Sequence, residues 1–292
     1  MIVDAHHHLW RPERGYTWLD DPALAAIRRP FTPQDLGAEL AGAGVRHSVL
    51  VEGGRCHADE AAEYLGHAAD SRSIDGSTGG PIAGVVAWAD VADPDLAATL
   101  RAYRGLRGGE FLVGVRSQVQ GEADPDYLDR PDVRRGLAAV AAAGLAFDLV
   151  VRADQLAAAA RAAQAVPELR FVLDHLGKPR IDAGEPGLRA WLGPFTELAA
   201  QPNVTCKLSG MVTEAGAQWT VEDLRPFVAA AVAAFGADRL MFGSDWPVCL
   251  LVADYGGVLD ALRQALPPLD AAGSAAVFGG TAVRTYGLAV PS

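Results

Sequence analysis

The sequence predicts a (β/α)8 barrel of the TIM type, and three observations lead to this fold class. Short runs of apolar and β-branched residues alternate with alanine-rich stretches of helical length along the whole chain. Most of the short runs are apolar almost throughout, as parallel strands are when both of their faces are covered. The chain has 292 residues, half of them hydrophobic, and this size suits one large α/β barrel.

The predicted strands are short and follow one another from the first residue to position 243. They cover Met1–Ala5, Val45–Val51, Ile82–Ala87, Val113–Arg116, Ala146–Val151, Arg170–Asp174, Val204–Lys207 and Leu240–Gly243. Strict alternation of strands and helices implies right-handed crossovers, and therefore parallel strands.

The predicted helices lie between these strands and after the last one. Many begin near Asp, Thr or Pro, and several end at Gly or Pro. They cover Pro33–Ala43, Ala58–Ala69, Asp93–Arg104, Pro131–Ala143, Gln155–Val166, Gly187–Ala200, Val221–Phe235, and then Tyr255–Leu266 and Ala271–Tyr286 as closing helices. The Gly- and Ser-rich stretch Ser71–Pro81 is predicted to be a surface loop.

A closed barrel is favoured over an open, doubly wound sheet. The open sheet would place a glycine fingerprint after the first strand, where this sequence has HHHLW. No Pro/Ser-rich linker or change of composition interrupts the chain, so residues 1–292 are expected to form one domain.

Composition and charge limit the partners and the compartment. Asp and Glu outnumber Lys and Arg by 36 to 25, a net charge of −11, and such a surface repels phosphate backbones and anionic lipids. Neither nucleic acid nor a membrane is therefore expected as a partner, and no signal peptide or membrane span is evident. The three cysteines are far apart, without a CxxC pair, which indicates a reducing, cytoplasmic location. The oligomeric state is not predicted.

Two histidines at the end of the first strand are candidate site residues. Side chains of a strand alternate between its faces, so His6 and His8 should point one way and His7 the other. Barrel enzymes carry their chemistry on the loops after the strands, and there this pair would have a spacing suited to a metal ion or a substrate. Two exposed loop histidines are the alternative.

The ends of the sixth and eighth strands add two further candidates. The sixth continues into DHLGKP (174–179) and the eighth into GSDWP (243–247), which place His175 and Asp245 at the same rim. A lone His175 would suit a structural role, but three such strand ends in one barrel favour a shared site. Asp174 is interpreted as structural, facing the helix layer or bonding a neighbouring loop.

Other polar and aromatic residues near strand ends are candidates for substrate binding. Hydrogen-bond donors and cations suit a substrate rich in oxygen atoms. The candidates are Arg116, Gln118, Asp148, Lys178, Lys207 and His57, with Glu52, Arg55, Ser117, Arg152 and Ser209 beside them, and Trp10, Trp18, Trp88 and Trp246 as apolar or sugar-stacking walls. Salt bridges at the rim, or plain packing of the tryptophans, would explain the same residues.

Three motifs resemble the amidohydrolase superfamily when they are taken together and in order. They are DAHHHLW (4–10), VLDHLGKP (172–179) and LMFGSDWPV (240–248). The likeness is greatest to the lactonase branch, which includes sugar lactonases and pyrone dicarboxylate lactonase, and it runs through nearly the whole chain. The resemblance implies a catalytic centre of His6, His8, His175 and Asp245, in which Asp245 activates water and the histidines and nearby cations polarise a carbonyl group.

The expected reaction is the hydrolysis of a small lactone, with a sugar aldonolactone as the expected substrate. Asp245 would take a proton from the attacking water, and cationic donors or a metal ion would stabilise the oxyanion. The sequence shows neither a G-x-S-x-G elbow nor a Cys/His nucleophile pair, so direct attack by water is expected.

The metal content stays open. Two-metal members of the superfamily also use a bridging Lys or Glu on the fourth strand and a histidine on the fifth, where this sequence has Arg116, Ser117 and Gln118, and then Asp148 and Arg152. A two-metal centre is therefore not expected. Either one divalent cation, preferably zinc, is held by His6, His8, His175 and Asp245, or the reaction proceeds without a metal.

Three rival functions use the same site. One is a metal-dependent decarboxylase of the same superfamily, which would lose activity with a chelator and release CO2. The second is a hydrolase of another cyclic ester or amide, and the third is a barrel that binds a sugar acid without converting it.

Overall fold

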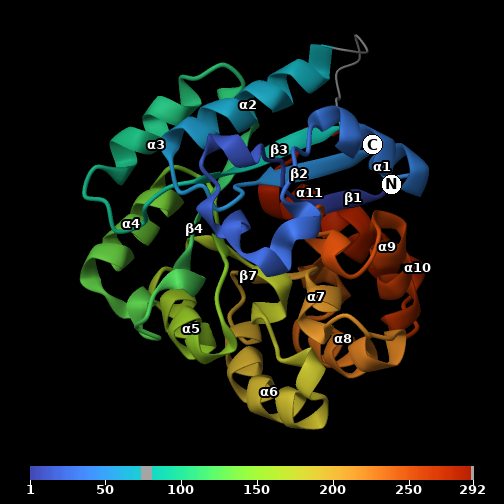
Figure 1. Cartoon of the computed structure of the whole chain (residues 1–292). Coiled ribbons are helices and arrows are strands. Elements are labelled where there is room, and N and C mark those ends of the chain that lie inside the picture. The colour runs from blue at the N-terminus through green and yellow to red at the C-terminus, as the bar shows by residue number, and fades with distance from the viewer. Residues whose placement is uncertain (74–80, 291–292) are drawn as a thin grey trace.

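A computed structural model, which describes residues 1–73 and 81–290, confirms the predicted (β/α)8 barrel. Eight parallel strands lie in one sheet in chain order, each hydrogen-bonded to the next (Figure 1). They are β1 (Val3–His7), β2 (His47–Val51), β3 (Ile82–Trp88), β4 (Leu112–Ser117), β5 (Ala146–Leu149), β6 (Arg170–Leu173), β7 (Val204–Leu208) and β8 (Leu240–Phe242). The ring closes between β8 and β1 through a parallel bridge between His7 and Trp246.

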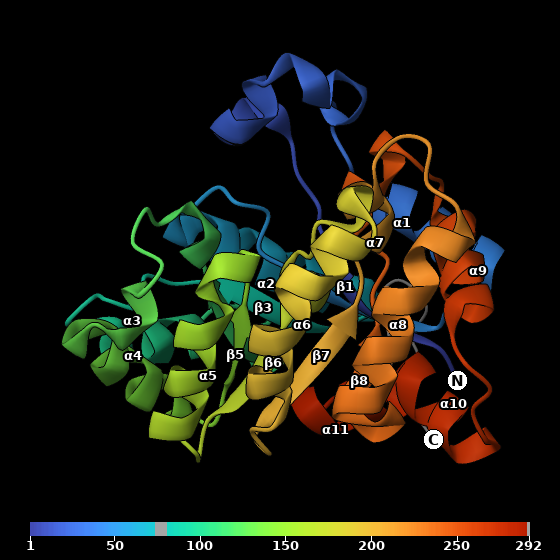
Figure 2. The same cartoon turned by 90° about the horizontal axis from the view of Figure 1, so that it is seen from below.

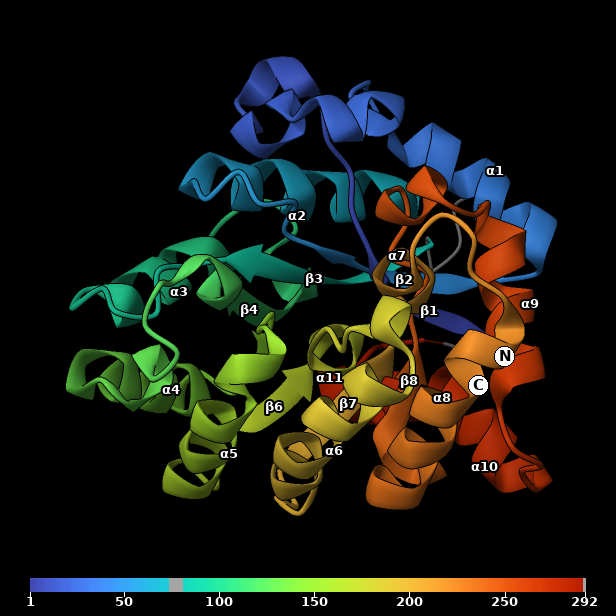
Figure 3. The same ribbon diagram turned by 60° about the horizontal axis from the view of Figure 1, so that its bottom comes forward.

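Helices surround the ring of strands. They are α1 (Pro33–Ala43), α2 (Ala58–Ser73), α3 (Leu96–Arg104), α4 (Pro131–Ala142), α5 (Leu156–Ala165), α6 (Glu185–Ala199), α7 (Met211–Ala215), α8 (Val221–Phe235), α9 (Tyr255–Ala265), α10 (Ala271–Ala275) and α11 (Thr281–Tyr286). Capping boxes begin two of them, with Thr32 and Asp35 at α1 and Thr220 and Asp223 at α8. Figure 3 shows α5, α6, α8 and α9 following one another around the outside of the barrel.

Each predicted strand and helix overlaps an observed one, with three differences. The predicted closing helix Ala271–Tyr286 is divided into α10, a π-helical turn over Ala276–Gly280, and α11. The short helix α7 was not predicted. Helix α2 extends to Ser73, so the prediction of a loop from Ser71 is wrong at its beginning, and positions 74–80 of that loop lie outside the described residues.

Two apolar layers build the molecule. The inner layer fills the barrel with alternate strand residues and is completed from below by α11 and the segment after it; its members are Val3, Ala5, Val49, Val51, Val86, Ala146, Val172, Met241, Ala282, Tyr286 and Leu288. The outer layer packs the other faces of the strands against the helices. Every second side chain of a strand points into the barrel, and we call this alternation the inward parity of the strand. Where the inward parity continues past the end of a strand, the side chains therefore point into the barrel mouth.

A small lobe stands over the carboxyl ends of the strands. It contains three 3-10 turns, Pro12–Arg14, Thr17–Asp20 and Pro22–Ile27, and Figure 2 shows it beyond the ends to which the strand arrows point. A bridge between Trp10 and Phe31 closes its base. None of the helices within residues 1–73 and 81–290 is both long and apolar enough to cross a membrane.

Two helical glycines allow a matched test of packing. A Cβ atom on Gly136 of α4 would lie 1.7 Å from the carbonyl oxygen of Val91, whereas one on Gly37 of α1 would meet nothing within 4 Å. We expect Gly136→Ala to lower the free energy of unfolding by about 1–3 kcal/mol through overpacking. Gly37→Ala should raise it by about 0.5–1 kcal/mol, because alanine loses less backbone entropy in a helix. Calorimetric unfolding of both variants measures the difference, and equal effects would contradict the close packing of α4.

Candidate active site

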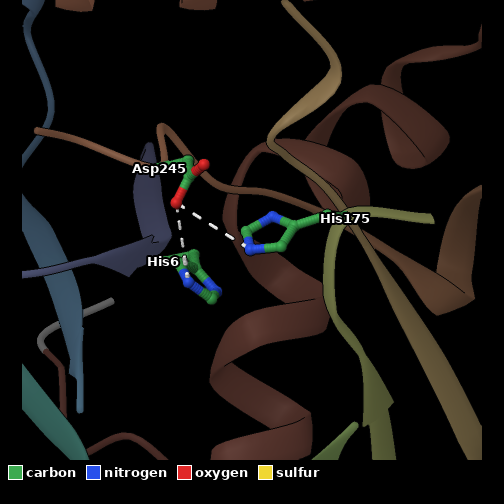
Figure 4. A group of neighbouring side chains, drawn as sticks. All are labelled: His6, His175 and Asp245. Carbon is green, nitrogen blue, oxygen red and sulfur yellow. Dashed lines mark ion pairs between the residues drawn. The ribbon is translucent and has the colours of Figure 1, made fainter. Parts of the chain in front are cut away.

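The structure brings together His6, His8, His175 and Asp245 at the barrel mouth, and their catalytic role stays a prediction. Figure 4 shows His6 and His175 converging on the Asp245 carboxylate. Asp245 Oδ1 lies 3.9 Å from Nε2 of His6, 3.8 Å from Nε2 of His175 and 3.5 Å from Nε2 of His8. All four residues are buried.

A β-bulge in β1 aims the opening histidines at the mouth. Asp4 pairs with Ser48 of β2, but the next pair is His7 with Leu50, so β1 has one residue more than its partner. Ala5 lies in the inner layer, and beyond it His6 and His8 also face inward. His7 turns to the other side, with Nε2 3.0 Å from Ser48 Oγ. The predicted orientations of the three histidines agree with this arrangement.

A left-handed turn brings His175 to the mouth. His175, Leu176 and Lys178 have φ values of 53°, 56° and 54°, which residues with a Cβ rarely adopt. Such positions cost about 1–3 kcal/mol each and persist where the surroundings hold them, often at functional sites. One such support is Ser209, whose Oγ lies 2.8 Å from His175 Nδ1. A Cβ on Gly210 would lie 2.7 Å from the same nitrogen, so the ring needs glycine there.

A buried carboxylate on the outer side of β1 fixes the end of β8. Asp4 accepts hydrogen bonds from Ser244 Oγ at 2.6 Å, from the Ser244 backbone nitrogen at 2.8 Å and from Tyr255 of α9 at 3.0 Å. Asp245 follows with a φ of 57°, and a Cβ on Gly243 would lie 2.8 Å from the Cβ of His6. These contacts hold Asp245 directly above His6.

Beneath the histidines lies a network of buried ion pairs centred on Asp174. Asp174 Oδ2 accepts from Arg116 Nη1 at 2.9 Å, and Oδ1 lies 2.9 Å from Lys207 Nζ. Lys207 also pairs with Asp148 at 2.5 Å, and Arg116 Nε with Glu52 Oε1 at 2.6 Å. None of these five side chains is more than 4% exposed.

The prediction that Asp174 faces the helix layer or a loop is therefore wrong. Val172 of β6 lies in the inner layer, and Asp174, two residues later, keeps its parity and points inward. There Asp174 Oδ1 also lies 3.2 Å from His6 Nδ1. Lys207 Nζ lies 3.1 Å from the same His6 nitrogen. Asp174 thus positions His6 from below.

Burial and these charges set the protonation states of the site. Burial alone would raise the pKa of Asp174, but Lys207 and His6 more than offset this effect, so its pKa lies well below the usual value. Burial, with Lys207, holds the pKa of His6 well below its usual value, and burial lowers the pKa of His175 to about 4. At neutral pH both imidazoles are therefore uncharged.

Asp245 remains ionised at neutral pH. Burial alone would raise the pKa of its carboxyl, but the interaction with the neighbouring His175 and the hydrogen bond from His8 outweigh burial, so the pKa lies below its usual value. A charged carboxylate among uncharged imidazoles is able to accept a proton from water.

The same groups fit a single divalent cation. The ligand atoms of His6, His175 and Asp245 lie within 4.8 Å of one another, and two nitrogens with one carboxylate suit a catalytic ion that keeps an open position. Outer hydrogen bonds orient the rings, since His175 contacts Ser209 and His8 Nδ1 lies 2.9 Å from the Val51 carbonyl oxygen. His8 stands beside the group, with its Nε2 3.1 Å from that of His6.

A cavity of about 300 Å³ opens above these residues, a size found for small-ligand sites. Its lining combines polar side chains with apolar surface: His8, His175, Asp245, Arg116, Gln118, Gln120 and Lys178, then Trp18, Val150 and Val248, with Gly53 and Gly54. The predicted substrate-binding residues Arg116, Gln118 and Lys178 therefore border the cavity.

The remaining predictions for substrate contact need correction. Asp148 and Lys207 lie in the ion-pair network beneath the cavity, because the inward parity of β5 and β7 buries them inside the barrel. His57 is 61% exposed and pairs with Asp59. Trp10 and Trp246 are buried in packing around Phe31, and Trp88 ends β3 outside the cavity lining.

Sequence reasoning missed several residues of the site. Gln120 and Val150 were not singled out, although Gln120 keeps the spacing of two from Gln118 that would have indicated it. Trp18 was only one of four candidate tryptophans. It comes from the lobe over the barrel, and no periodic pattern in the sequence predicts the position of that lobe. Tyr286 donates to both oxygens of Asp148, at 2.9 and 2.8 Å, from the last helix of the chain.

Glu60 supports the cavity wall from behind. Its Oε1 accepts a hydrogen bond from the backbone nitrogen of Gly53 at 3.0 Å, while Oε2 has no hydrogen-bond partner among the described residues. Burial, together with the charge of Glu52, raises the pKa of Glu60 to about 8.

Comparison with known proteins gives full-length matches. A family model described as Amidohydrolase matches residues 3–288. An L-fucono-1,5-lactonase from Burkholderia ambifaria is 37% identical over 294 residues, which cover 99% of this chain and 97% of the relative. One from Burkholderia multivorans is 37% identical over 305 residues, covering 100% and 98%. The crystal structure of a Burkholderia multivorans amidohydrolase with bound zinc has a TM-score of 0.89 at 36% identity and covers 99% of both chains.

The raised pKa of Glu60 predicts a pH-dependent stability. The Glu60 carboxyl has a pKa of about 8 in the folded protein, so its contribution to the free energy of unfolding is fully present at pH values below its unfolded pKa. This contribution is lost as the pH rises towards 8, because the folded state then opposes ionisation of the carboxyl group. Glu60→Gln removes the titration, so its melting temperature should rise relative to wild type between pH 5 and 8.5. The change should correspond to at least about 1.4 kcal/mol, the equivalent of one pKa unit. Thermal unfolding at several pH values measures it, and a constant difference would contradict the prediction.

Proposed function

The chain belongs to the amidohydrolase family, and on that premise we propose that it hydrolyses the ring ester of a small sugar lactone. The observation that carries the proposal is the ionised Asp245 among imidazoles at the floor of a cavity of about 300 Å³. Two L-fucono-1,5-lactonases that match the whole length of the chain support the choice of a sugar lactone.

Asp245 acts as the general base. It accepts a proton from a water molecule, whose oxygen forms a bond to the lactone carbonyl carbon. Charge then develops on the carbonyl oxygen, and the Lys178 side chain, which borders the cavity, stabilises it. The bond between this carbon and the ring oxygen breaks, Asp245 returns the proton to that oxygen, and a hydroxy acid leaves.

The environment of Asp245 suits both of its tasks. The histidines keep its pKa below the ordinary value, so it is ready as a base at neutral pH. His8 and His175 lie on two sides of the carboxylate, with Nε2 atoms 3.5 and 3.8 Å from Oδ1, and limit its orientation. A positioned carboxylate of this kind contributes about 10²–10⁴-fold to a rate.

We propose zinc as the divalent ion that His6, His175 and Asp245 would hold. The zinc-bound relative at 36% identity and the mixture of nitrogen and carboxylate ligands support this choice. A bound zinc ion polarises a carbonyl group and makes water more acidic. Lys207 Nζ lies 3.1 Å from Nδ1 of His6 and Arg116 Nη1 lies 3.4 Å from its Nε2, and these two cationic groups leave no room beside that ring for a second cation.

The cavity lining fits a sugar ring. Gln118, Gln120 and Lys178 offer hydrogen bonds, whereas Trp18, Val150 and Val248 cover apolar ring atoms. A five- or six-membered aldonolactone has hydroxyl groups on its ring carbons and C–H bonds between them, so both kinds of surface have a partner.

The proposal predicts that Asp245→Asn lowers lactone hydrolysis by about 10²–10⁴-fold, because the amide cannot accept the proton. A pH indicator follows acid release from a panel of aldono-1,4- and 1,5-lactones. Asp260→Asn, at a 63%-exposed position on α9, is the matched control and should keep full activity. Failure of folded wild-type protein to hydrolyse any lactone would refute the proposed function, and release of CO2 from aromatic acids would replace it with decarboxylation.

The metal site has a separate test by binding. We expect metal-free protein to take up one zinc ion per chain, measured by calorimetric titration and elemental mass spectrometry. His175→Ala removes a ligand and should weaken binding at least about 10-fold. His57→Ala, on the exposed side chain that pairs with Asp59, should leave it unchanged. Equal affinities in the two variants would show that zinc binds elsewhere.

A further inference from the structure

A chain of hydrogen bonds leads from a buried carboxylate to one wall of the cavity. Glu52, which follows β2 and is fully buried, receives Arg116 Nε at 2.6 Å and the Gly54 backbone nitrogen at 2.7 Å. Gln118 Nε2 donates to the same Glu52 carboxylate. Gln120 Nε2 in turn donates to Gln118 Oε1 at 3.0 Å. Gln118 and Gln120 border the cavity.

The carboxylate fixes the orientation of both amides. Glu52 is paired with Arg116 and only accepts hydrogen bonds, so Gln118 must turn its NH2 group towards Glu52 and its oxygen away. Gln120 must then give its NH2 group to that oxygen. If Gln120 turned over, two amide oxygens would face each other. Gln120 therefore keeps its own Oε1, which accepts no hydrogen bond from residues 1–73 or 81–290, as the acceptor at the end of the chain.

The backbone of Gln120 is held as well. Its nitrogen donates to the carbonyl oxygen of Val150 at 2.9 Å, and its carbonyl oxygen accepts from Arg152 Nη1. Two anchored backbone groups and one anchored side-chain NH2 group leave little freedom to the amide. A preorganised acceptor of this kind loses little entropy when a hydroxyl group donates to it.

The charges around the cavity disfavour an acidic ring substituent at this wall. Arg116 is already paired with Glu52 and Asp174, at 2.6 and 2.9 Å. Lys178, the other cation of the lining, has no carboxylate within 4.0 Å among residues 1–73 and 81–290, and is therefore free to meet the carboxylate that lactone hydrolysis creates. A second carboxylate on the ring would face amide oxygens and Glu52 without a free cation.

We propose that Gln120 is a specificity-determining residue that accepts a hydrogen bond from a ring hydroxyl group of the substrate. Gln118 and Glu52 are positioning residues that set the direction of this acceptor. The wall then selects neutral, polyhydroxylated lactones over lactones whose rings carry carboxylates. This inference rests on the proposed function and specifies the substituents that the same cavity accepts.

Two lactones that differ in ring hydroxyl groups test the role of Gln120. The ratio of kcat/KM for the best-hydrolysed aldono-1,5-lactone to that for δ-valerolactone, which has no hydroxyl group, is compared between variants. Gln120→Leu should lower this ratio about 10-fold, the effect of one lost hydrogen bond, with δ-valerolactone almost unaffected. Gln264→Leu, at an exposed position on α9, is the control and should leave the ratio unchanged.

Two further variants test the positioning residues. Glu52→Gln places an N–H group beside Gln118, so the Gln118 amide is no longer held in one orientation. The ratio of the two kcat/KM values should therefore fall, although Glu52 does not border the cavity. Gln118→Leu breaks the chain without removing the partner of Arg116, and should lower the ratio even if Glu52→Gln does not fold. Equal losses for both lactones in Gln120→Leu would overturn the inference while the proposed function stood. Hydrolysis of a pyrone dicarboxylate as fast as of the aldonolactone would also overturn it.

Binding of lactams separates this inference from the proposed function, because an amide is much less reactive than an ester and its binding can be measured apart from ring opening. Calorimetry compares an aldono-1,5-lactam with δ-valerolactam. We expect the hydroxylated lactam to bind more tightly to wild type, and Gln120→Leu to remove about 10-fold of this preference. This result without lactone turnover would support the role of Gln120 as an acceptor for a ring hydroxyl group and would refute the proposed lactone hydrolysis. If wild-type protein bound the two lactams equally well, the proposed role of Gln120 would be overturned.

Discussion

The active-site end of this barrel depends on the buried carboxylate of Asp174 and its two cations. Arg116 from β4 and Lys207 from β7 meet Asp174 at the end of β6, each at 2.9 Å. The arrangement is expensive, because burying charges costs several kcal/mol for each ion, and it persists only where each charge has its partner. Removal of one partner of such a pair costs about 3–5 kcal/mol, since the remaining charge is left buried and unpaired.

The chemistry of the mouth follows from this arrangement. Asp174 and Lys207 meet at Nδ1 of His6, so its Nε2 is left to face Asp245. Burial keeps His6 and His175 uncharged at neutral pH, while Asp245 stays ionised. The site thus holds a proton acceptor beside imidazoles that are able to bind a metal ion, above charges that compensate one another.

The backbone shares the work of positioning. The bulge in β1 and the left-handed conformations of His175 and Asp245 bring three side chains to one point from three strands. Glycines give them space, at Gly210 against the His175 ring and at Gly243 against His6. Around this point the cavity is lined by two kinds of surface. One consists of the amide groups of Gln118 and Gln120, which are oriented from Glu52, and the other is apolar and includes Trp18. A sugar lactone offers complementary groups to both.

The sequence by itself determined the barrel and predicted the central residues of the candidate site. Period and composition marked every strand, and the motifs at the ends of β1, β6 and β8 identified His6, His8, His175 and Asp245, because local patterns carry that information. Only the tertiary structure decided that Asp174 lies under His6, that Lys207 and Asp148 are buried beneath the cavity, and that Trp18 and Gln120 border it. These properties depend on strand parity across the whole ring, on a lobe folded over the mouth and on contacts such as that of Tyr286 with Asp148. Such contacts join residues that lie far apart in the chain, 138 positions in the case of Tyr286 and Asp148, and no local pattern specifies them.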